Sequence, residues 1–400
     1  MKSWVEISER RLAANYRLLC NAAGHETAVL AVVKANAYGH GAAVCAPAAV
    51  RAGAEWLGVT DAEEGVAVRA SLAAASVEQP RILVMCGLLG DETEAIVRSG
   101  LTPVVWEQQQ MEWLAAAVLQ HGGDAAPLPV HLEIDTGMAR QGIVPGEGLR
   151  TLLHWMKRQP RLRLEGVMTH FAAPEVAGSA LTAVQRERFE EAMAVVEEAG
   201  LQPEWVHAGN SSVVDTWGAE ENLGWVQSVA KRAGARAMVR AGIALYGYCL
   251  PIEQACSGDD VVLAKVRPGL QPVMTWKTRV IGLREVKAGD TVGYNGIFAA
   301  ERAMRLALLS AGYADGLRRE LSGSNARAGG WVMVRGQRAA IVGRVSMNLT
   351  VVDVTEVSGV GVGDEAVLLG DGVTADDHAR LAGTIAYEIV CGVRAASRLV

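Results

Sequence analysis

Short apolar runs recur eight times in the first 247 residues, separated by segments with a different pattern. Between most of these runs, apolar residues return at spacings of three and four, as they do in amphipathic helices. Eight strand-helix units predict a (β/α)8 barrel whose strands are buried on both faces, although the same periodicity also fits a doubly wound sheet. The runs are AVLAVVKA from Ala28, WLGVT from Trp56, RILVMCG from Arg81, LTPVVW from Leu101, PVHLEID from Pro129, RLEGVMTH from Arg163, WVHAGN from Trp205 and AMVRAGIALYG from Ala237.

The pattern changes after Pro251. Runs such as VMTWKTRVIGLREV and GWVMVRGQRAAIVG alternate apolar and polar residues and are separated by glycine-containing turns, which predicts β strands. One helix is predicted over TADDHARLAGTIAYEIV, with Thr374 as its N-cap. The second half of the chain is therefore expected to be mainly β.

These patterns predict two domains. We expect an α/β barrel over residues 1–248 and a C-terminal, mainly β domain over residues 249–400. Residues 1–8 are a candidate strand of the β domain. The segment from Cys249 to Asp260 is the best linker candidate.

Composition narrows the class of protein. The chain has 400 residues, half of them hydrophobic and a fifth charged, which suits two domains with large cores. Its net charge of −6 and dispersed basic residues leave no basic stripe for nucleic acid. No signal-peptide or membrane-spanning run is visible, so we expect a soluble cytoplasmic protein without a membrane partner. Six scattered cysteines without paired spacing argue against a metal site and against a disulfide framework.

Lys34 is the first candidate for chemistry, because it ends the first predicted strand in the run AVVKANAYGHG. Partial desolvation at such a position lowers the pKa of a lysine and frees its amine for an imine or a proton transfer. A solvated lysine at a strand end is the alternative.

Other candidates lie at the ends of later strands, where barrels of this kind place their chemistry. His170 ends the sixth strand, Asn210 and Ser211 follow the seventh, and Gly242 and Ile243 lie in the eighth unit. A hydroxyl and backbone amides after the last two strands are candidates for holding a phosphate dianion.

The run VKANAYGHG resembles the cofactor-anchoring segment of the alanine racemases, which use pyridoxal 5'-phosphate. Eight further motifs resemble that family in the family's order, and together they cover almost the whole chain. They are DTGMARQG from Asp135, THF from Thr169, HAGNS from His207, RAGIALYG from Arg240, VGYN from Val292, GYADG from Gly312, GRVSM from Gly343 and YEIVCG from Tyr387. The resemblance implies a pyridoxal-binding barrel joined to a β domain, and a homodimer that pairs head to tail with shared active sites.

The resemblance also implies an activity, the interconversion of L- and D-alanine by two bases acting on an imine of pyridoxal phosphate. Lys34 matches the lysine that forms the imine and serves as one base, and Tyr294 matches the opposite base, donated by the other subunit. Arg240 matches the partner of the pyridine nitrogen, and His170 matches a neighbour of that arginine. Because a guanidinium does not give up a proton at neutral pH, the pyridine is expected to stay unprotonated, which favours return of the proton to Cα.

The remaining roles concern the phosphate and the substrate. Five residues match the family's phosphate contacts: Tyr38, Ser211, Gly242, Ile243 and Tyr387. Arg140 matches the residue that binds the phenolic oxygen of the cofactor and the carboxylate of the substrate. Tyr313 and the backbone of Met347 match carboxylate contacts from the partner chain.

Three positions depart from the family pattern. Glu133 stands where many members have a lysine that is often carbamylated, and we hypothesise that its carboxylate orients Arg140 without such a modification. Asn348 replaces a usual aspartate and Asn295 a common glycine, which leaves substrate access open. The segment between Ser212 and Arg236, with Trp217 and Trp225, is longer than the family's usual connection.

Two alternatives to an alanine racemase remain at this stage. One is a serine or broad-specificity racemase, or a related decarboxylase of the same barrel group, although Tyr387 is expected to exclude large side chains and the GYADG and AYGHG motifs do not suit the decarboxylases. The other is a non-catalytic pyridoxal carrier, a class whose known barrel examples lack the β domain.

Overall fold

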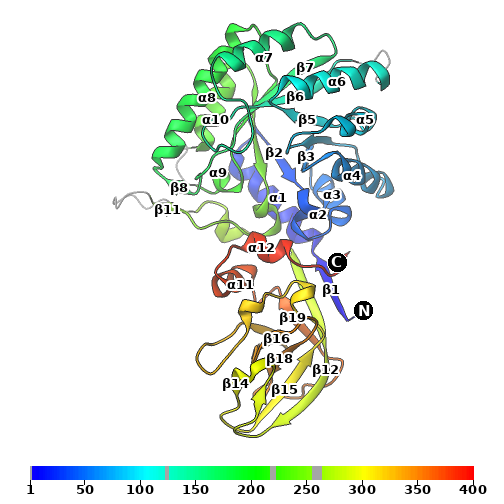
Figure 1. Cartoon of the computed structure of the whole chain (residues 1–400), viewed down its shortest axis with the longest axis vertical. Coiled ribbons are helices and arrows are strands. Elements are labelled where there is room, and N and C mark those ends of the chain that lie inside the picture. The colour runs from blue at the N-terminus through cyan, green and yellow to red at the C-terminus, as the bar shows by residue number, and fades with distance from the viewer. Residues whose placement is uncertain (1, 122–125, 217–221, 255–263) are drawn as a thin grey trace. The chain divides into compact units, whose positions relative to one another are not determined.

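The computed structural model describes residues 2–121, 126–216, 222–254 and 264–400 (Figure 1). By its contacts the chain divides into two compact units. The barrel unit comprises Ala13–Ala35 and Ala46–Leu270, and the second unit comprises Met1–Leu12, Asn36–Cys45 and Gln271–Val400. Part of the predicted linker, residues 255–263, lies outside the described residues.

Eight parallel strands close into a barrel, which confirms the predicted (β/α)8 architecture and excludes the doubly wound sheet. The first and last strands of the barrel pair directly, with Arg240 opposite Leu30, and this pairing closes the ring. Short strands such as β3 and β5 are buried at every residue, as expected when side chains fill the barrel and helices cover it. The strands are β2 (Thr27–Val32), β3 (Trp56–Val59), β4 (Arg81–Val84), β5 (Thr102–Val105), β6 (Leu128–Glu133), β7 (Leu162–Met168), β9 (Trp205–His207) and β10 (Arg236–Ala241).

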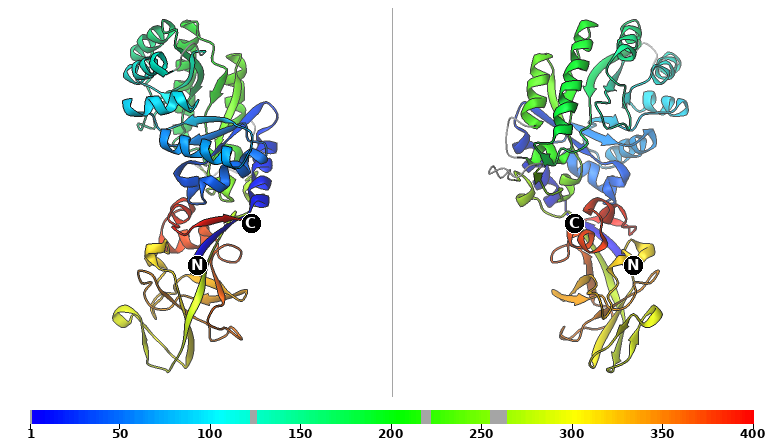
Figure 2. Two further views of the ribbon diagram at one scale, coloured as in Figure 1. Left: turned by 90° about the vertical axis from the view of Figure 1, so that its right-hand side faces the viewer. Right: turned by 60° about the vertical axis from the view of Figure 1, so that its left-hand side comes forward.

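Helices follow the barrel strands and surround them (Figures 1 and 2). The predicted helix after β3 begins where Asp61 accepts a hydrogen bond from the backbone N–H of Glu64, a regular N-cap. The helices are α1 (Glu9–Ala23), α3 (Ala42–Arg51), α4 (Ala62–Ala74), α5 (Thr93–Arg98), α6 (Gln108–His121), α7 (Glu147–Lys157), α8 (Ala180–Glu198), α9 (Ser211–Asp215) and α10 (Asn222–Arg232).

The long segment after Ser212 forms helix α10, and its Trp225 packs against α8. The Trp225 ring lies 5.7 Å from that of Phe189 and 5.6 Å from that of Phe171, and its indole N–H donates to Glu190 at 2.6 Å. Trp225 therefore helps to cover the outside of the barrel. Trp217 lies outside the described residues.

The second unit is built on an eight-stranded sheet, which confirms the predicted mainly β character. Its longest strand, β12 (Met274–Val286), pairs with β1 (Ser3–Ile7), β15 (Met304–Leu309) and β19 (Glu365–Leu369). Strand β1 also pairs in parallel with β20 (Ser397–Leu399), so the strands nearest the two termini lie side by side (Figure 2). The other strands of this sheet are β16 (Trp331–Val334), β17 (Gln337–Ala340) and β18 (Thr350–Asp353).

Two small ribbons complete the strand inventory of the described residues. In the barrel unit, β8 (Val176–Ala177) pairs with β11 (Glu253–Gln254). In the second unit, β13 (Thr291–Val292) pairs with β14 (Phe298–Ala299). No helix among the described residues is both long and apolar enough to span a membrane.

The prediction of one continuous helix from Thr374 was wrong. The structure has two helices, α11 (Ala375–Ala382) and α12 (Ala386–Cys391). Gly383 ends the first one in a left-handed conformation, with φ of 69°, which is the usual helix-terminating role of glycine. The predicted N-cap is confirmed, because the Thr374 side chain accepts from the backbone N–H of Asp377.

Candidate active site

Lys34 lies just beyond the end of β2 and begins a short turn, α2 (Lys34–Tyr38). The four residues that follow Lys34 have φ between 51° and 55°, so the turn is left-handed. This conformation costs L-amino acids roughly 1–2 kcal/mol per residue. Backbone in such disfavoured conformations persists only where surrounding contacts hold it, and it concentrates at functional sites.

Contacts within the second unit hold this turn. His40 is fully buried, and its Nδ1 lies 3.1 Å from the carbonyl of Ala37 and 3.0 Å from that of Tyr38. Since carbonyl oxygens only accept, Nδ1 carries the proton and donates to both. Gly39 packs so closely that a Cβ on it would lie 2.3 Å from the carbonyl oxygen of Val390. Gly39 and His40 of the AYGHG motif are therefore needed to hold the backbone of this turn.

Arg240 is buried near the end of β10 and is held by three acceptors. Its guanidinium donates to Nδ1 of His207 at 3.0 Å, to the carbonyl oxygen of Thr169 at 2.8 Å and to Nδ1 of His170 at 3.1 Å. Burial lowers the pKa of Arg240 to about 10, so the side chain stays charged at neutral pH. Burial and the Arg240 charge lower the pKa of His170 to about 3, so this ring is neutral and able to accept.

Two residues that support this arrangement were not assigned a role from the sequence. His207 lies in the HAGNS motif, and the motif by itself does not show which way its ring points. Gln185 on α8 donates to the carbonyl oxygen of His170 at 3.0 Å and accepts from the backbone N–H of Ala172 at 2.9 Å. It therefore fixes the backbone at the end of β7.

Asn210, Ser211, Gly242 and Ile243 come together at the ends of β9 and β10. The Ser211 hydroxyl oxygen accepts from the backbone N–H of Gly242 at 3.1 Å and of Ala244 at 3.2 Å. Asn210 caps α9 with its side chain, which accepts from the backbone N–H of Ser212 at 2.9 Å. Convergent backbone N–H groups and a hydroxyl are the groups that hold phosphate in proteins.

Arg140 lies on an exposed loop that follows β6. The carboxylate of Asp135 fixes this loop by accepting from three backbone N–H groups, those of Gly137 at 2.9 Å, Met138 at 3.0 Å and Ala139 at 3.1 Å. Ala139 has a left-handed φ of 54°, a conformation that the Asp135 contacts help to hold. The loop therefore presents Arg140 in a defined direction from the barrel end.

The carboxylate of Glu133 accepts its hydrogen bond from Gln141 and not, as we hypothesised, from Arg140. Its buried carboxylate accepts from the side chain of Gln141, which also donates to the carbonyl oxygen of Met85 at 2.9 Å. Burial raises the pKa of Glu133, while the Gln141 hydrogen bond and the charges of Arg240 and Arg140 oppose that rise. The direct hydrogen-bond partner is Gln141 instead of Arg140, and Arg140 acts on Glu133 only through its charge.

Four of the predicted residues of the second unit form two pairs. The rings of Tyr38 and Tyr387 lie 6.0 Å apart and tilted by 55°. The GYADG and GRVSM motifs lie together, since the backbone N–H of Tyr313 donates to Ser346 at 3.0 Å and a Cβ on Gly312 would lie 2.1 Å from the carbonyl oxygen of Ser346. The backbone therefore places Tyr313 beside Met347.

Tyr294 has an exposed side chain in a turn of unusual backbone. The residue is 67% exposed within this chain. The residue before it, Gly293, has φ of 73°, and the residue after it, Asn295, has φ of 61°. Asn295 thus replaces the family's common glycine without changing the required conformation, because asparagine tolerates left-handed backbone better than most residues. Asn348 donates weakly to Asp315, at 3.4 Å.

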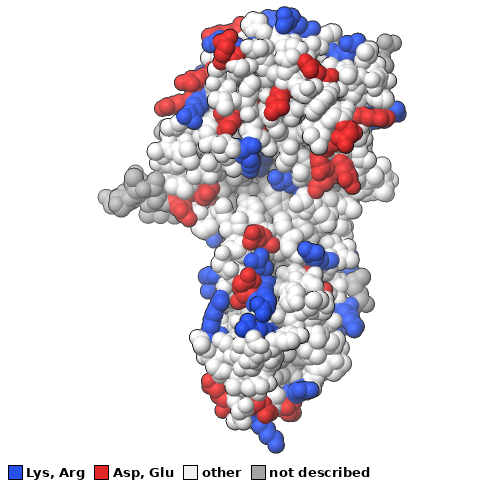
Figure 3. Space-filling model, viewed as in Figure 1, with Lys and Arg blue, Asp and Glu red and all other residues white. Residues whose placement is uncertain are grey.

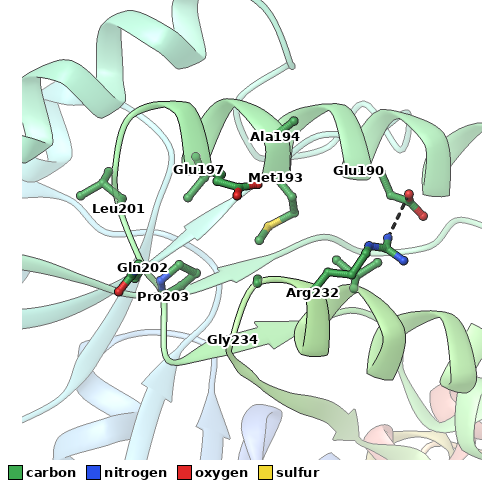
Figure 4. Close-up of a pocket in the computed structure, with 12 residues that line it drawn as sticks. Glu190, Met193, Ala194, Glu197, Leu201, Gln202, Pro203, Arg232 and Gly234 are labelled. Carbon is green, nitrogen blue, oxygen red and sulfur yellow. Dashed lines mark ion pairs between the residues drawn. The ribbon is translucent and has the colours of Figure 1, made fainter.

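A separate pocket of about 460 Å3 lies between α8, α10 and the loop before β9 (Figure 4). Its polar lining includes the ion pair of Arg232 and Glu190 at 3.0 Å. Its loop residues, such as Pro203 and Gly234, precede barrel strands, whereas Lys34 and Arg240 lie toward strand ends. In barrels of this kind chemistry lies at the carboxyl ends, so this pocket is not the candidate active site.

Charged side chains are dispersed on the face of the barrel unit shown in Figure 3, with acidic and basic residues interspersed. On that face they form no continuous basic band of the kind a nucleic-acid backbone requires.

Comparison with known proteins identifies the family. Residues 7–250 match the family model for the alanine racemase N-terminal domain, and residues 273–400 match that for the alanine racemase C-terminal domain. The alanine racemase of Syntrophobacter fumaroxidans is 35% identical over 395 residues, covering 98% of this chain and 95% of its own. That of Symbiobacterium thermophilum is 36% identical, with 98% and 94% covered.

Solved structures agree with the sequence relatives. The alanine racemase of Streptomyces coelicolor A3(2) superposes with a TM-score of 0.84 at 34% identity and covers 100% of this chain and 98% of its own. The alanine racemase of Bartonella henselae, crystallised with covalently bound pyridoxal phosphate, gives a TM-score of 0.78 at 27% identity and covers 100% of both chains. The chain therefore belongs to the alanine racemase family of isomerases.

Proposed function

We propose that this racemase interconverts L- and D-alanine with pyridoxal 5'-phosphate as its cofactor, using Lys34 of one copy and Tyr294 of a partner copy as opposing bases. The observation that carries the proposal is the arrangement at the barrel end. Lys34 follows the first barrel strand, Ser211 follows the seventh, and the buried Arg240 lies on the eighth.

The residues at this end fit pyridoxal phosphate. A phosphate dianion suits the hydroxyl of Ser211 and the backbone at Gly242 and Ile243. The oxygen of Ser211 accepts from the backbone N–H groups of Gly242 and Ala244, which leaves its own proton to be donated to the phosphate. A pyridine nitrogen suits Arg240, which only donates. The three acceptors of Arg240 occupy three of its five N–H groups, and within the described part of the chain the other two have no hydrogen-bond partner. Lys34 supplies the amine for a covalent link.

When bound, pyridoxal phosphate draws electrons from the bond between Cα and its hydrogen, which allows a weak base to remove that proton. Racemisation requires removal from one face and return to the other. We assign one face to the Lys34 amine and the other to the Tyr294 hydroxyl, each acting as base in one direction and acid in the reverse. Arg240 keeps the pyridine nitrogen unprotonated, which favours return of the proton to Cα over other outcomes.

The substrate carboxylate is assigned to three groups: the guanidinium of Arg140, the hydroxyl of Tyr313 and the backbone of Met347. The Asp135 contacts fix the loop that bears Arg140, and backbone hydrogen bonds fix Tyr313 beside Met347. We assign the Tyr38 and Tyr387 hydroxyls to the phosphate. The bulk of Tyr387 is expected to favour a methyl side chain over larger ones.

Exposure supports a paired state. Tyr294, Tyr313 and Met347 are 67%, 43% and 56% exposed in the single chain, although each is proposed to contact the substrate. A second copy of the chain is the partner that would bury them and complete two equivalent sites. The head-to-tail pairing and the cytoplasmic location stay predictions.

Activity is tested by incubating the purified protein, loaded with pyridoxal phosphate, with single L-amino acids and following the loss of optical rotation. We expect activity with alanine and little with serine, lysine or arginine. Lys34→Ala should abolish turnover and the absorbance of the lysine-bound cofactor. Lys231→Ala, at an exposed lysine on α10, is the matched control and should change neither. A Lys34→Ala protein that retained both would refute the assignment of Lys34.

Sharing of sites is tested by mixing two inactive variants, Lys34→Ala and Tyr294→Phe, under conditions that exchange subunits. If each site takes Lys34 from one copy and Tyr294 from the other, every mixed dimer contains one intact site. Random exchange should then restore about one quarter of the wild-type activity. If both bases came from the same copy, no mixture would regain activity, and the paired site would be ruled out.

A further inference from the structure

A line of buried polar side chains crosses the inside of the barrel, starting from Arg240. Nδ1 of His207 accepts from Arg240 at 3.0 Å, and Nε2 of the same ring lies 2.8 Å from Nδ1 of His131. Nε2 of His131 lies 3.4 Å from a carboxylate oxygen of Glu165. These residues come from β10, β9, β6 and β7, and His131 contacts His207 across the intervening strand β7. Contact across a strand places them in the barrel interior.

The far end of the line is an ionised carboxylate held by two arginines. Glu165 has no exposed side-chain surface and accepts from Arg81 and, at 2.7 Å, from Arg163. Burial alone would raise the pKa of Glu165, but hydrogen bonds from His131 and Arg81 together with the charge of Arg81 lower it to about 2. Arg81 also stacks 4.5 Å above the ring of Trp56. The carboxylate is therefore a fixed acceptor inside the barrel.

The chemistry of the groups gives the line one direction. A guanidinium only donates, so Nδ1 of His207 must be unprotonated and its proton must be on Nε2. That proton is donated to Nδ1 of His131, so the proton of His131 is on Nε2 and is donated to Glu165. Burial lowers the pKa of both rings, which keeps each of them neutral and in a single tautomer. Arg240 at one end, which only donates, and the Glu165 carboxylate at the other, which only accepts, both require the proton of each ring to be on Nε2.

We infer that Glu165 is a positioning residue of the active site: through His131 it fixes the tautomer of His207, and so fixes the direction in which Arg240 presents its remaining N–H groups. The role rests on the proposed function, in which those N–H groups meet the pyridine nitrogen. Without an acceptor at position 165, His131 is free to take the opposite tautomer. Its Nδ1 proton would then point at His207, whose own proton would move to Nδ1 and face Arg240.

The barrel is shaped to hold His131 in this line. Gly166 lies opposite His131 in the pairing of β6 and β7, where the register shifts. A Cβ on Gly166 would lie 2.6 Å from Nδ1 of His131. The ring also lies 5.5 Å from that of Trp56 and 4.9 Å from that of His207. The position of the His131 ring in this line therefore requires glycine at position 166, because any side chain there would collide with the ring.

The primary test is nitrogen NMR of the full-length protein with 15N-labelled histidine, with signals assigned by their loss in His131→Gln and His207→Gln. In the wild type we expect both rings to be protonated on Nε2 only. Glu165→Leu should give a second tautomer at His207 and lower kcat for alanine on the order of tenfold with little change in KM. The matched control is Glu204→Gln, which removes the other carboxylate partner of Arg163 and should leave both readouts unchanged.

Glu165→Gln provides a conservative rescue. Its amide oxygen still accepts from His131, while Arg81 and Arg163, whose side chains are 41% and 42% exposed, can turn to water. We expect one tautomer at His207 and most of the wild-type turnover. If Glu165→Leu does not fold, the His207 tautomer and the turnover of Glu165→Gln test the inference instead.

A His207 ring protonated on Nδ1, or cationic at neutral pH, in the wild type would overturn the inference. So would a Glu165→Leu protein whose His207 signals or turnover matched those of the wild type. Absence of racemase activity in the wild type would instead reject the proposed function, and the tautomers would still be measured independently.

Discussion

Gly166→Ala is the substitution whose effect follows most directly from the geometry. Its new methyl group would lie 2.6 Å from Nδ1 and 2.7 Å from both Cε1 and Cγ of His131. Normal contacts are about 3.5–4.0 Å, so the ring must move by about 1 Å. The His131 ring has no exposed surface, and movement by that amount would break its 2.8 Å hydrogen bond with His207.

Two costs follow. Overpacking a core typically costs about 1–3 kcal/mol, and a buried donor without its acceptor costs about 1–3 kcal/mol more. Replacing glycine also restricts the unfolded chain, which offsets about 0.5–1 kcal/mol. We therefore expect Gly166→Ala to lower the free energy of unfolding of the barrel unit by about 3 kcal/mol. Turnover should fall as well, because Arg240 loses a fixed acceptor.

Urea titration followed by tryptophan fluorescence measures the effect, since the Trp56 ring lies 5.5 Å from that of His131 and 5.7 Å from that of Trp205. Gly148→Ala is the matched control, because nothing lies within 4 Å of a Cβ at this position near the start of α7. It should be neutral or stabilise by about 0.5–1 kcal/mol. A Gly166→Ala protein as stable as the control would refute the reasoning from the His131 contact.

Three further substitutions test other parts of the structure. Asp135→Ala removes the acceptor of three backbone N–H groups and should raise KM for alanine about tenfold by freeing the Arg140 loop, measured by steady-state kinetics. Asn295→Gly should leave stability and turnover nearly unchanged, whereas Asn295→Val should cost about 1–2 kcal/mol, because valine disfavours φ of 61°. Burial lowers the pKa of His378 to about 4, so the unfolded chain binds the extra proton between pH 6.5 and 4. The free energy of unfolding should therefore decrease as the pH is lowered through that window, by up to about 1.4 kcal/mol per pH unit. The decrease should be smaller in His378→Gln, as thermal unfolding at each pH will show.

The apolar runs predicted the barrel because each buried parallel strand needs a continuous apolar segment, and all eight runs are strands. The short helix α5 has six residues, too few for a helical period to be visible. The helix predicted from Thr374 continued through Gly383 because the flanking residues keep a helical pattern. Only the backbone shows that this glycine ends α11.

Some contacts of the candidate site were also predictable from the sequence, and others were not. Strand-end positions predicted that Ser211 and Gly242 come together, because neighbouring parallel strands end at the same edge. The contact of His131 with His207 joins residues that are 76 positions apart, and no local pattern carries such information. Glu133 and Gln141 show a second limit, since a sequence does not tell which of two adjacent polar residues turns inward.

Both proposed bases stand next to backbone that L-amino acids avoid. Lys34 precedes four residues with left-handed φ, and Tyr294 lies between Gly293 and Asn295, which are both left-handed. In neither place does glycine supply all of the required conformations, so packing must hold them. A base whose neighbouring backbone has only one packed conformation loses little freedom when substrate binds, and the cost of ordering it is met during folding instead of during catalysis.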